Sequence, residues 1–192
     1  MIGLAPGGEG IRAVTWGTTP SGPAGAQSGL EPVPVDQRLQ DMVDADDIVG
    51  VAVRYASALD SRDWERLRTC FVPDAVAVYE GIGRLEGVAA IERACQASLG
   101  PLDASQHFVS NFESDVQGDR AAASCYLQAQ HVRRGTPGGD LFTVAGIYVD
   151  TLARTSEGWR IVTRELRRLW TAGNPDVLGH RARDAADGPP PA

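Results

Sequence analysis

Lysine is absent from all 192 residues, so the 18 cationic side chains are all arginine. Schiff-base catalysis, the anchoring of pyridoxal phosphate and the phosphate-binding P-loop each depend on a lysine ammonium group. The sequence therefore excludes these three kinds of chemistry.

Basic residues are also outnumbered by acidic ones, and the net charge is −7. Without a basic stripe to follow a phosphate backbone, no nucleic-acid partner is expected. No apolar run approaches the roughly 20 residues of a membrane span, and the first residues lack the basic start and apolar run of a signal peptide. We therefore expect a cytoplasmic protein with no membrane partner and a small-molecule substrate.

Cysteine and histidine are scarce and scattered. The three cysteines and three histidines are Cys70, Cys95, Cys125, His107, His131 and His180. Because no CxxC, HExxH or similar ligand spacing occurs, we expect no metal site, and we expect no cofactor. The cysteines fit free thiols buried in a reducing cytoplasm. Catalysis by a cysteine nucleophile stays open but has no local signature.

Composition divides the chain into three segments. Residues 1–34 are rich in Gly and Pro and have almost no apolar periodicity, which predicts a disordered extension. The end, residues 179–192, has the same character and predicts a disordered tail. Between them, residues 35–178 form one domain that is long enough for a hydrophobic core.

The first half of this domain has helical patterns. Apolar residues such as Leu39, Val43, Ile48 and Tyr55 recur every three or four positions, typical of one buried helical face, although the aspartates at 44–47 leave open a division into two helices. Pro73 is expected to stop a second helix. The expected elements are helices at 36–59, 60–71 and 87–99 and a strand at 75–79.

The second half has strand patterns closed by glycine-containing turns. The expected strands are 106–116, 121–133, 141–154 and 159–170. Short turns between long strands predict an antiparallel meander. The sequence therefore predicts an α+β cone, in which a curved antiparallel sheet has its concave face covered by the N-terminal helices and a pocket lies between them.

Three side chains have the chemistry that acid and base catalysis at a carbonyl needs: Tyr55, Asp60 and His107. Each also has a structural interpretation. Tyr55 lies on the apolar helical face, where a core tyrosine is the commoner case. Asp60 suits the N-cap of the second helix, with Asp63 as the reciprocal carboxylate of a capping box. Tyr55 and Asp60 are five residues apart, so we expect them to converge only if the helix breaks at residues 59–60.

Other polar residues have weaker claims. His131 precedes Val132-Arg133-Arg134 at a strand end, where we expect solvent exposure, and His180 lies in the tail. Gly81, Gly83 and Gly87 follow a strand and precede a helix, as in a dinucleotide-binding turn, but their spacing is wrong and no parallel βαβ unit follows. These glycines are better explained as shaping the rim of the pocket.

The motifs together resemble a known family. Tyr55-x4-Asp60-x-x-Asp63-Trp64, Phe71-x-x-Asp74-Ala, Gln106-His107, Gly118-Asp119-Arg-Ala and Glu157-Gly158-Trp159-Arg-Ile161 are similar to the SnoaL-like group of the nuclear transport factor 2-like superfamily. Within it the chain most resembles the scytalone dehydratase and bile acid 7α-dehydratase type. The resemblance implies Tyr55, Asp60 and His107 as catalytic residues. It also leads us to expect four substrate-binding residues: Trp64, Asn111, Gln130 and Arg164.

The function implied is a cofactor-independent dehydratase or isomerase that acts on a polycyclic or aromatic hydroxy-ketone. His107 would take a proton, Asp60 would orient its ring and Tyr55 would act as the acid. A polyketide cyclase, an epoxide hydrolase, a non-catalytic ligand-binding or dimerisation module, and a subunit resembling the small subunit of ring-hydroxylating dioxygenases stay open. Apolar outer faces of the strands lead us to expect a homodimer packed sheet to sheet.

Overall fold

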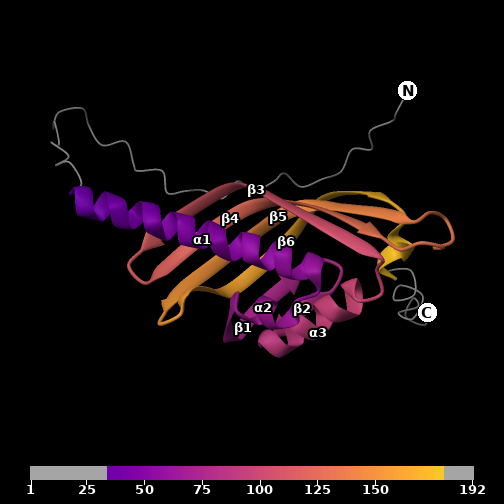
Figure 1. Cartoon of the computed structure of the whole chain (residues 1–192), viewed down its shortest axis with the longest axis horizontal. Helices are drawn as coiled ribbons and strands as arrows, with labels where there is room; N and C mark the ends of the chain where they lie inside the picture. Colours follow the sequence, from indigo (N-terminus) through magenta and orange to yellow (C-terminus); the bar gives the residue numbers. More distant parts are fainter. Residues whose placement is uncertain (1–33, 180–192) are drawn as a thin grey trace, which may run out of the picture. The chain divides into compact units, whose positions relative to one another are not determined.

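The computed structural model describes residues 34–179 (Figure 1). The predicted extension at 1–34 and tail at 179–192, with His180, lie almost wholly outside the described residues. In chain order the helices are α1 (Val35–Ser61), α2 (Trp64–Arg68), α3 (Val88–Leu99) and the 3-10 helix η1 (Pro175–Leu178). The strands are β1 (Phe71–Tyr79), β2 (Gly83–Glu86), β3 (Ala104–Gln117), β4 (Arg120–Val132), β5 (Leu141–Thr155) and β6 (Gly158–Gly173).

The helix α1 is one continuous helix, so neither the division near Asp44 nor the break at residues 59–60 occurs. It ends after Ser61, where Arg62 adopts a left-handed conformation and donates its backbone N–H to the last turn. The predicted buried face is correct from Ile48 onward. Leu39 and Val43 are exposed, because only the later turns of α1 pack on the sheet.

The segment after α1 differs from the expectation of a long second helix. The helix α2 has only five residues, and Asp63 is its N-cap, accepting a hydrogen bond from the Arg66 backbone N–H. Asp60 is therefore not the cap. Phe71 opens the strand β1 instead of ending a helix, because pairing with β6 buries it and satisfies its backbone.

The sheet has six strands in the order β2-β1-β6-β5-β4-β3. The strands β3 to β6 form the predicted antiparallel meander, each paired with the next along the chain. The strand β1 lies parallel to β6, so the sheet is mixed and the expectation of a purely antiparallel sheet is wrong in this detail. The strand β2 was not expected; it pairs with β1 as an edge hairpin.

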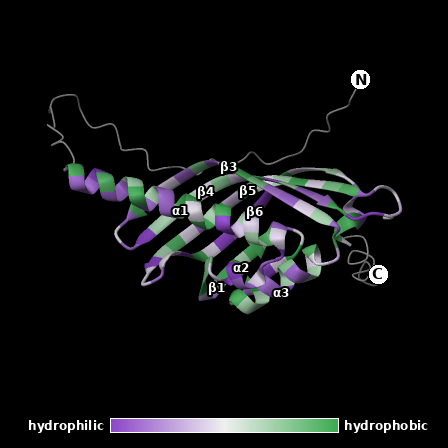
Figure 2. Ribbon diagram, viewed as in Figure 1, coloured by the Kyte–Doolittle hydropathy of each residue, from purple (hydrophilic) through white to green (hydrophobic). Residues whose placement is uncertain are grey.

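The helices lie against one face of this sheet, with α1 crossing β3 and β6 and α3 packed beside β1 (Figure 1). Hydrophilic and hydrophobic bands alternate along the long strands in Figure 2, as expected for a sheet whose two faces have different environments. The α+β cone predicted from the sequence is confirmed. No helix within residues 34–179 is long and apolar enough to cross a membrane.

Candidate active site

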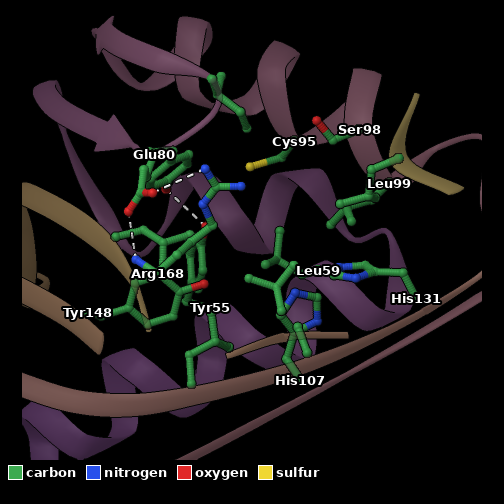
Figure 3. A pocket seen from close by; sticks show the side chains of 17 residues that line it. Tyr55, Leu59, Glu80, Cys95, Ser98, Leu99, His107, His131, Tyr148 and Arg168 are labelled. Carbon is green, nitrogen blue, oxygen red and sulfur yellow. Dashed lines mark hydrogen bonds and ion pairs between the residues drawn. The ribbon is translucent and has the colours of Figure 1, made fainter. Parts of the chain in front are cut away.

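A cavity of about 90 Å³ lies between the sheet and the helices, and Figure 3 shows the side chains around it. This is room for several water molecules, and so for a small organic compound. The lining is drawn from α1, α3, η1 and most of the strands: Tyr55, Leu59, Tyr79, Glu80, Ile82, Cys95, Ser98, Leu99, His107, Leu127, Ala129, His131, Val144, Tyr148, Leu166, Arg168 and Leu178.

His107 and Asp60 form a close pair at this cavity. The His107 Nδ1 lies 2.6 Å from one carboxylate oxygen of Asp60, and the His107 backbone N–H donates to the other oxygen over 2.9 Å. The Ser105 hydroxyl donates to the first oxygen. Because Nδ1 is occupied by Asp60, Nε2 is the ring nitrogen that can meet a ligand.

The electrostatics of this pair keep Asp60 ionised. Partial burial raises the pKa of Asp60, but hydrogen bonds from the His107 ring, the His107 backbone and Ser105 outweigh it, so that the pKa lies below its ordinary value. An ionised Asp60 holds the proton of a neutral imidazole on Nδ1 and leaves a lone pair on Nε2. Asp60 reaches His107 because it lies in the last turn of α1, beside the start of β3.

Tyr55 and Tyr79 contribute two phenols to the same cavity. Their hydroxyl oxygens are 2.9 Å apart, so one of the two O–H groups donates to the other phenol and the second hydrogen is available to another acceptor. Burial is the main reason that the pKa of each phenol lies well above its ordinary value. Both groups therefore stay protonated and act as donors at neutral pH.

Arg164 supports the ring of Tyr55 from outside the cavity. It is 1% exposed and pairs with Asp150 through two hydrogen bonds of 2.8 and 2.6 Å. Its guanidinium lies 4.2 Å from the ring centres of both Tyr55 and Tyr148, a cation–π arrangement. Arg164 thus fixes the ring of Tyr55 and does not line the cavity as a substrate-binding residue.

The other three predicted substrate-binding residues also lie outside the cavity lining. Trp64 begins α2 and packs at the edge of the core. Asn111 has a φ of 52° where the pairing of β3 with β4 shifts register, and this bulge breaks the alternation that would have turned it inward. Gln130 alternates with the inward-facing Ala129 and His131, and it hydrogen-bonds Thr143.

His131 is the main site residue that the sequence reasoning misplaced. It is buried, not solvated, and its Nδ1 lies 3.1 Å from the backbone oxygen of Phe142. Its ring meets the ring of His107 edge to face, with centres 5.7 Å apart. The signal was present in the sequence, because His131 has the same strand parity as Leu127 and Ala129, which face the cavity.

Cys95, Ser98, Glu80 and Arg168 are further polar residues of the lining and were also missed. Burial raises the pKa of the Cys95 thiol to about 11, so the sulfur is a protonated thiol and a poor nucleophile at neutral pH. The three cysteines are all buried free thiols. The Glu80 and Arg168 side chains form an ion pair at 3.1 Å.

A mixed sheet covered on one face by helices, with a cavity between them, defines an α+β protein of the nuclear transport factor 2-like class. Residues 40–165 match the SnoaL-like domain, and the chain belongs to this family. An uncharacterized protein of Mycobacterium tuberculosis is 32% identical over 120 residues, which are 62% of this chain and 80% of that protein.

Three solved structures show the same fold. A nuclear transport factor 2-like protein with a cystatin-like fold from Novosphingobium aromaticivorans is 27% identical with a TM-score of 0.60, over 76% of this chain and 93% of that one. A putative scytalone dehydratase from the same organism has 24% identity and a TM-score of 0.62, over 73% and 92%. A hexachlorocyclohexane dehydrochlorinase has 18% identity and a TM-score of 0.61, over 71% and 90%.

Proposed function

We propose that this protein is a lyase or isomerase of the dehydratase type, which removes water from a small cyclic or aromatic hydroxy-ketone using its own side chains as acid and base. The observation that carries the proposal is the pairing of His107 with an ionised Asp60 at a cavity that also holds the Tyr55 and Tyr79 phenols. A base, His107, and proton donors, the two phenols, therefore line the same small cavity.

The base in this proposal is His107. Its Nε2 takes the acidic proton next to the ligand carbonyl, and the ring becomes an imidazolium. The carboxylate of Asp60, 2.6 Å from Nδ1, stabilises that positive charge. The hydrogen bond to Asp60 also fixes the ring so that Nε2 stays directed away from the helix end.

The acid is the pair of phenols. Because burial keeps both protonated, the hydroxyl hydrogen not used between Tyr55 and Tyr79 can bond to the enolate oxygen or to the departing hydroxyl group. As the C–O bond breaks, the phenol proton passes to the departing hydroxyl group, which leaves as water, and the proton that His107 removed returns to the phenolate. The ring of Tyr55 is clamped by Arg164 on one face and by the edge contacts with Phe71 and Tyr148. The donor is therefore held in place before a ligand arrives.

The remaining lining suits a ring compound. Leu59, Leu99, Leu127, Val144 and Leu166 give the cavity apolar walls that pack on a hydrocarbon ring and exclude water from the charged intermediate. The likeness to a structure described as a putative scytalone dehydratase favours loss of water among the reactions that such an acid and base pair can catalyse.

A panel of cyclic β-hydroxy-ketones with one to three rings tests the proposal, since loss of water forms a conjugated enone that absorbs in the ultraviolet. Tyr55→Phe should slow turnover by about two orders of magnitude with little change in the thermal midpoint. The matched control is Tyr126→Phe, which also deletes a tyrosine hydroxyl, but from an exposed residue of β4. Equal turnover by these two variants would overturn the role of Tyr55.

A further inference from the structure

The cavity contains one ion pair that the proposed acid and base chemistry does not use. Glu80 follows β1 and Arg168 lies on β6, and both side chains line the cavity. The Arg168 Nη2 is 3.1 Å from the Glu80 Oε1, and the Arg168 backbone N–H donates to the Glu80 Oε2 over 2.9 Å. Arg168 is the only arginine among the lining residues of the described chain.

This pair has the properties of an exchangeable contact. The Arg168 side chain is 29% exposed and that of Glu80 is 52% exposed, and an ion pair with this much solvent contact is weak. Glu80 would keep its bond to the backbone N–H if the guanidinium moved to another partner. Within residues 34–179 the ion pair with Glu80 engages only Nη2 of the guanidinium, so Nε and Nη1 can bind a second acceptor.

Gly81 lies against the guanidinium of Arg168. A Cβ atom at this position would lie 3.4 to 3.6 Å from three guanidinium atoms of Arg168, which is ordinary van der Waals contact. Gly81 also has a φ of +89°, which favours glycine. The turn between β1 and β2 therefore lies against the guanidinium of Arg168.

We propose that Arg168 binds a carboxylate group of the ligand, and that Glu80 occupies this position when the ligand is absent. Arginine binds carboxylates through paired N–H donors in one plane, and the contact with Glu80 shows that the guanidinium is placed for a carboxylate. In Figure 3 the guanidinium lies with Glu80, away from His107 and His131. A cyclic oxo-acid or hydroxy-acid can then place its carboxylate at Arg168 and its reacting carbon near His107.

This inference deepens the proposed function, but it concerns binding and is tested without turnover. The probes are cinnamate and cinnamamide, which have the same ring and side chain and differ in charge. Isothermal titration calorimetry should show that the wild-type protein binds cinnamate at least ten-fold more tightly than cinnamamide. Arg168→Gln should abolish the preference, and Arg168→Lys should restore part of it.

A substitution of Glu80, the other member of the ion pair, provides a further control. Glu80→Gln keeps an oxygen for the Arg168 backbone N–H but removes the competing charge, so cinnamate should bind several-fold more tightly and cinnamamide should bind as before. Unchanged circular dichroism and unfolding midpoints would show that both variants fold. His107→Ala should retain the carboxylate preference, because His107 lies outside this contact.

Three results would overturn the inference: cinnamamide binding as tightly as cinnamate, a full preference in Arg168→Gln, or no binding of cinnamate at millimolar concentration. A carboxylate preference in a protein that turns over none of the hydroxy-ketones would support this inference and count against the proposed function. Turnover of a neutral hydroxy-ketone without any carboxylate preference would support the proposed function and count against this inference.

Discussion

Replacing Asp60 with asparagine should switch the tautomer of His107. The two carboxylate oxygens of Asp60 have different partners: Oδ2 accepts the backbone N–H of His107, whereas Oδ1 contacts the ring Nδ1 and the Ser105 hydroxyl. In Asp60→Asn the backbone N–H can only donate, so it must keep the amide oxygen. The new NH₂ group then faces Nδ1.

The consequence for catalysis follows from this geometry. An NH₂ group donates to Nδ1, so the single proton of the neutral imidazole moves to Nε2. Because Nε2 is the nitrogen available to a ligand, the base then carries a proton where it should have a lone pair. We expect turnover to fall by about three orders of magnitude, near the middle of the range for loss of a general base.

Folding should be affected much less. The variant keeps the hydrogen bond from the His107 backbone, and the Ser105 hydroxyl can accept where it formerly donated. The side chain of Asp60 is about one quarter exposed, so the loss of a charge-assisted contact should cost about 1 kcal/mol of unfolding free energy. A loss of activity much larger than the loss of stability would separate the catalytic role from a structural one.

Nitrogen-15 NMR of the histidine side chains measures the tautomer directly and needs no substrate. At a pH where His107 is neutral, the wild-type ring should carry its proton on Nδ1, and Asp60→Asn should carry it on Nε2. His131 provides an internal reference, because its Nδ1 contacts the Phe142 backbone oxygen and the substitution should leave this contact unchanged. If His107 keeps the proton on Nδ1 in the variant, the reasoning about the amide orientation is wrong.

Two further predictions concern stability and assembly. Asp44 is buried and binds Arg154 through two hydrogen bonds of 2.7 Å, so Asp44→Asn should lower the free energy of unfolding in urea by about 2 kcal/mol, whereas Asp47→Asn on the exposed side of α1 should change it little. The hydrogen bond from Arg154 holds the pKa of Asp44 below its ordinary value of 3.8. The ionised Asp44 therefore stabilises the fold above that pH, and this stabilisation is lost as the pH falls below it. On acidification, Asp44→Asn should lose less stability than the wild-type protein. Phe108 and Tyr126 are about half exposed on the neighbouring strands β3 and β4. We therefore expect a sheet-to-sheet homodimer, which Tyr126→Arg should convert to monomers. Sedimentation of the wild-type protein only as a monomer at micromolar concentration would contradict this prediction.

The sequence was most informative where one local signal determined one element. Period-two alternation and glycine-containing turns predicted β3 to β6 within a few residues, and the apolar pattern of 87–99 predicted α3. The pairing of β1 with β6 could not be predicted in this way. It joins residues about 90 positions apart, and the short segment after Pro73 has no alternation of its own.

The candidate site was also predictable only in part. The spacing of Tyr55 and Asp60 suggested a helix break that the structure does not contain, because Asp60 reaches His107 from the last turn of an unbroken helix. The contact of Arg164 with Asp150 and the pairing of Arg168 with Glu80 depend on long-range packing of β6, which no local pattern shows. His131 could have been found by strand parity, had its arginine neighbours been given less weight.

Proton abstraction by His107 is the central claim, and incorporation of deuterium next to a ligand carbonyl tests it most directly. Proton NMR in D₂O would follow the loss of the α-hydrogen signal from a panel of cyclic ketones and hydroxy-ketones in the presence of the wild-type protein or His107→Ala. The account predicts that the wild-type protein accelerates exchange for at least one compound and that His107→Ala slows it by two to four orders of magnitude while folding normally. Exchange at the same rate with both proteins would contradict the account.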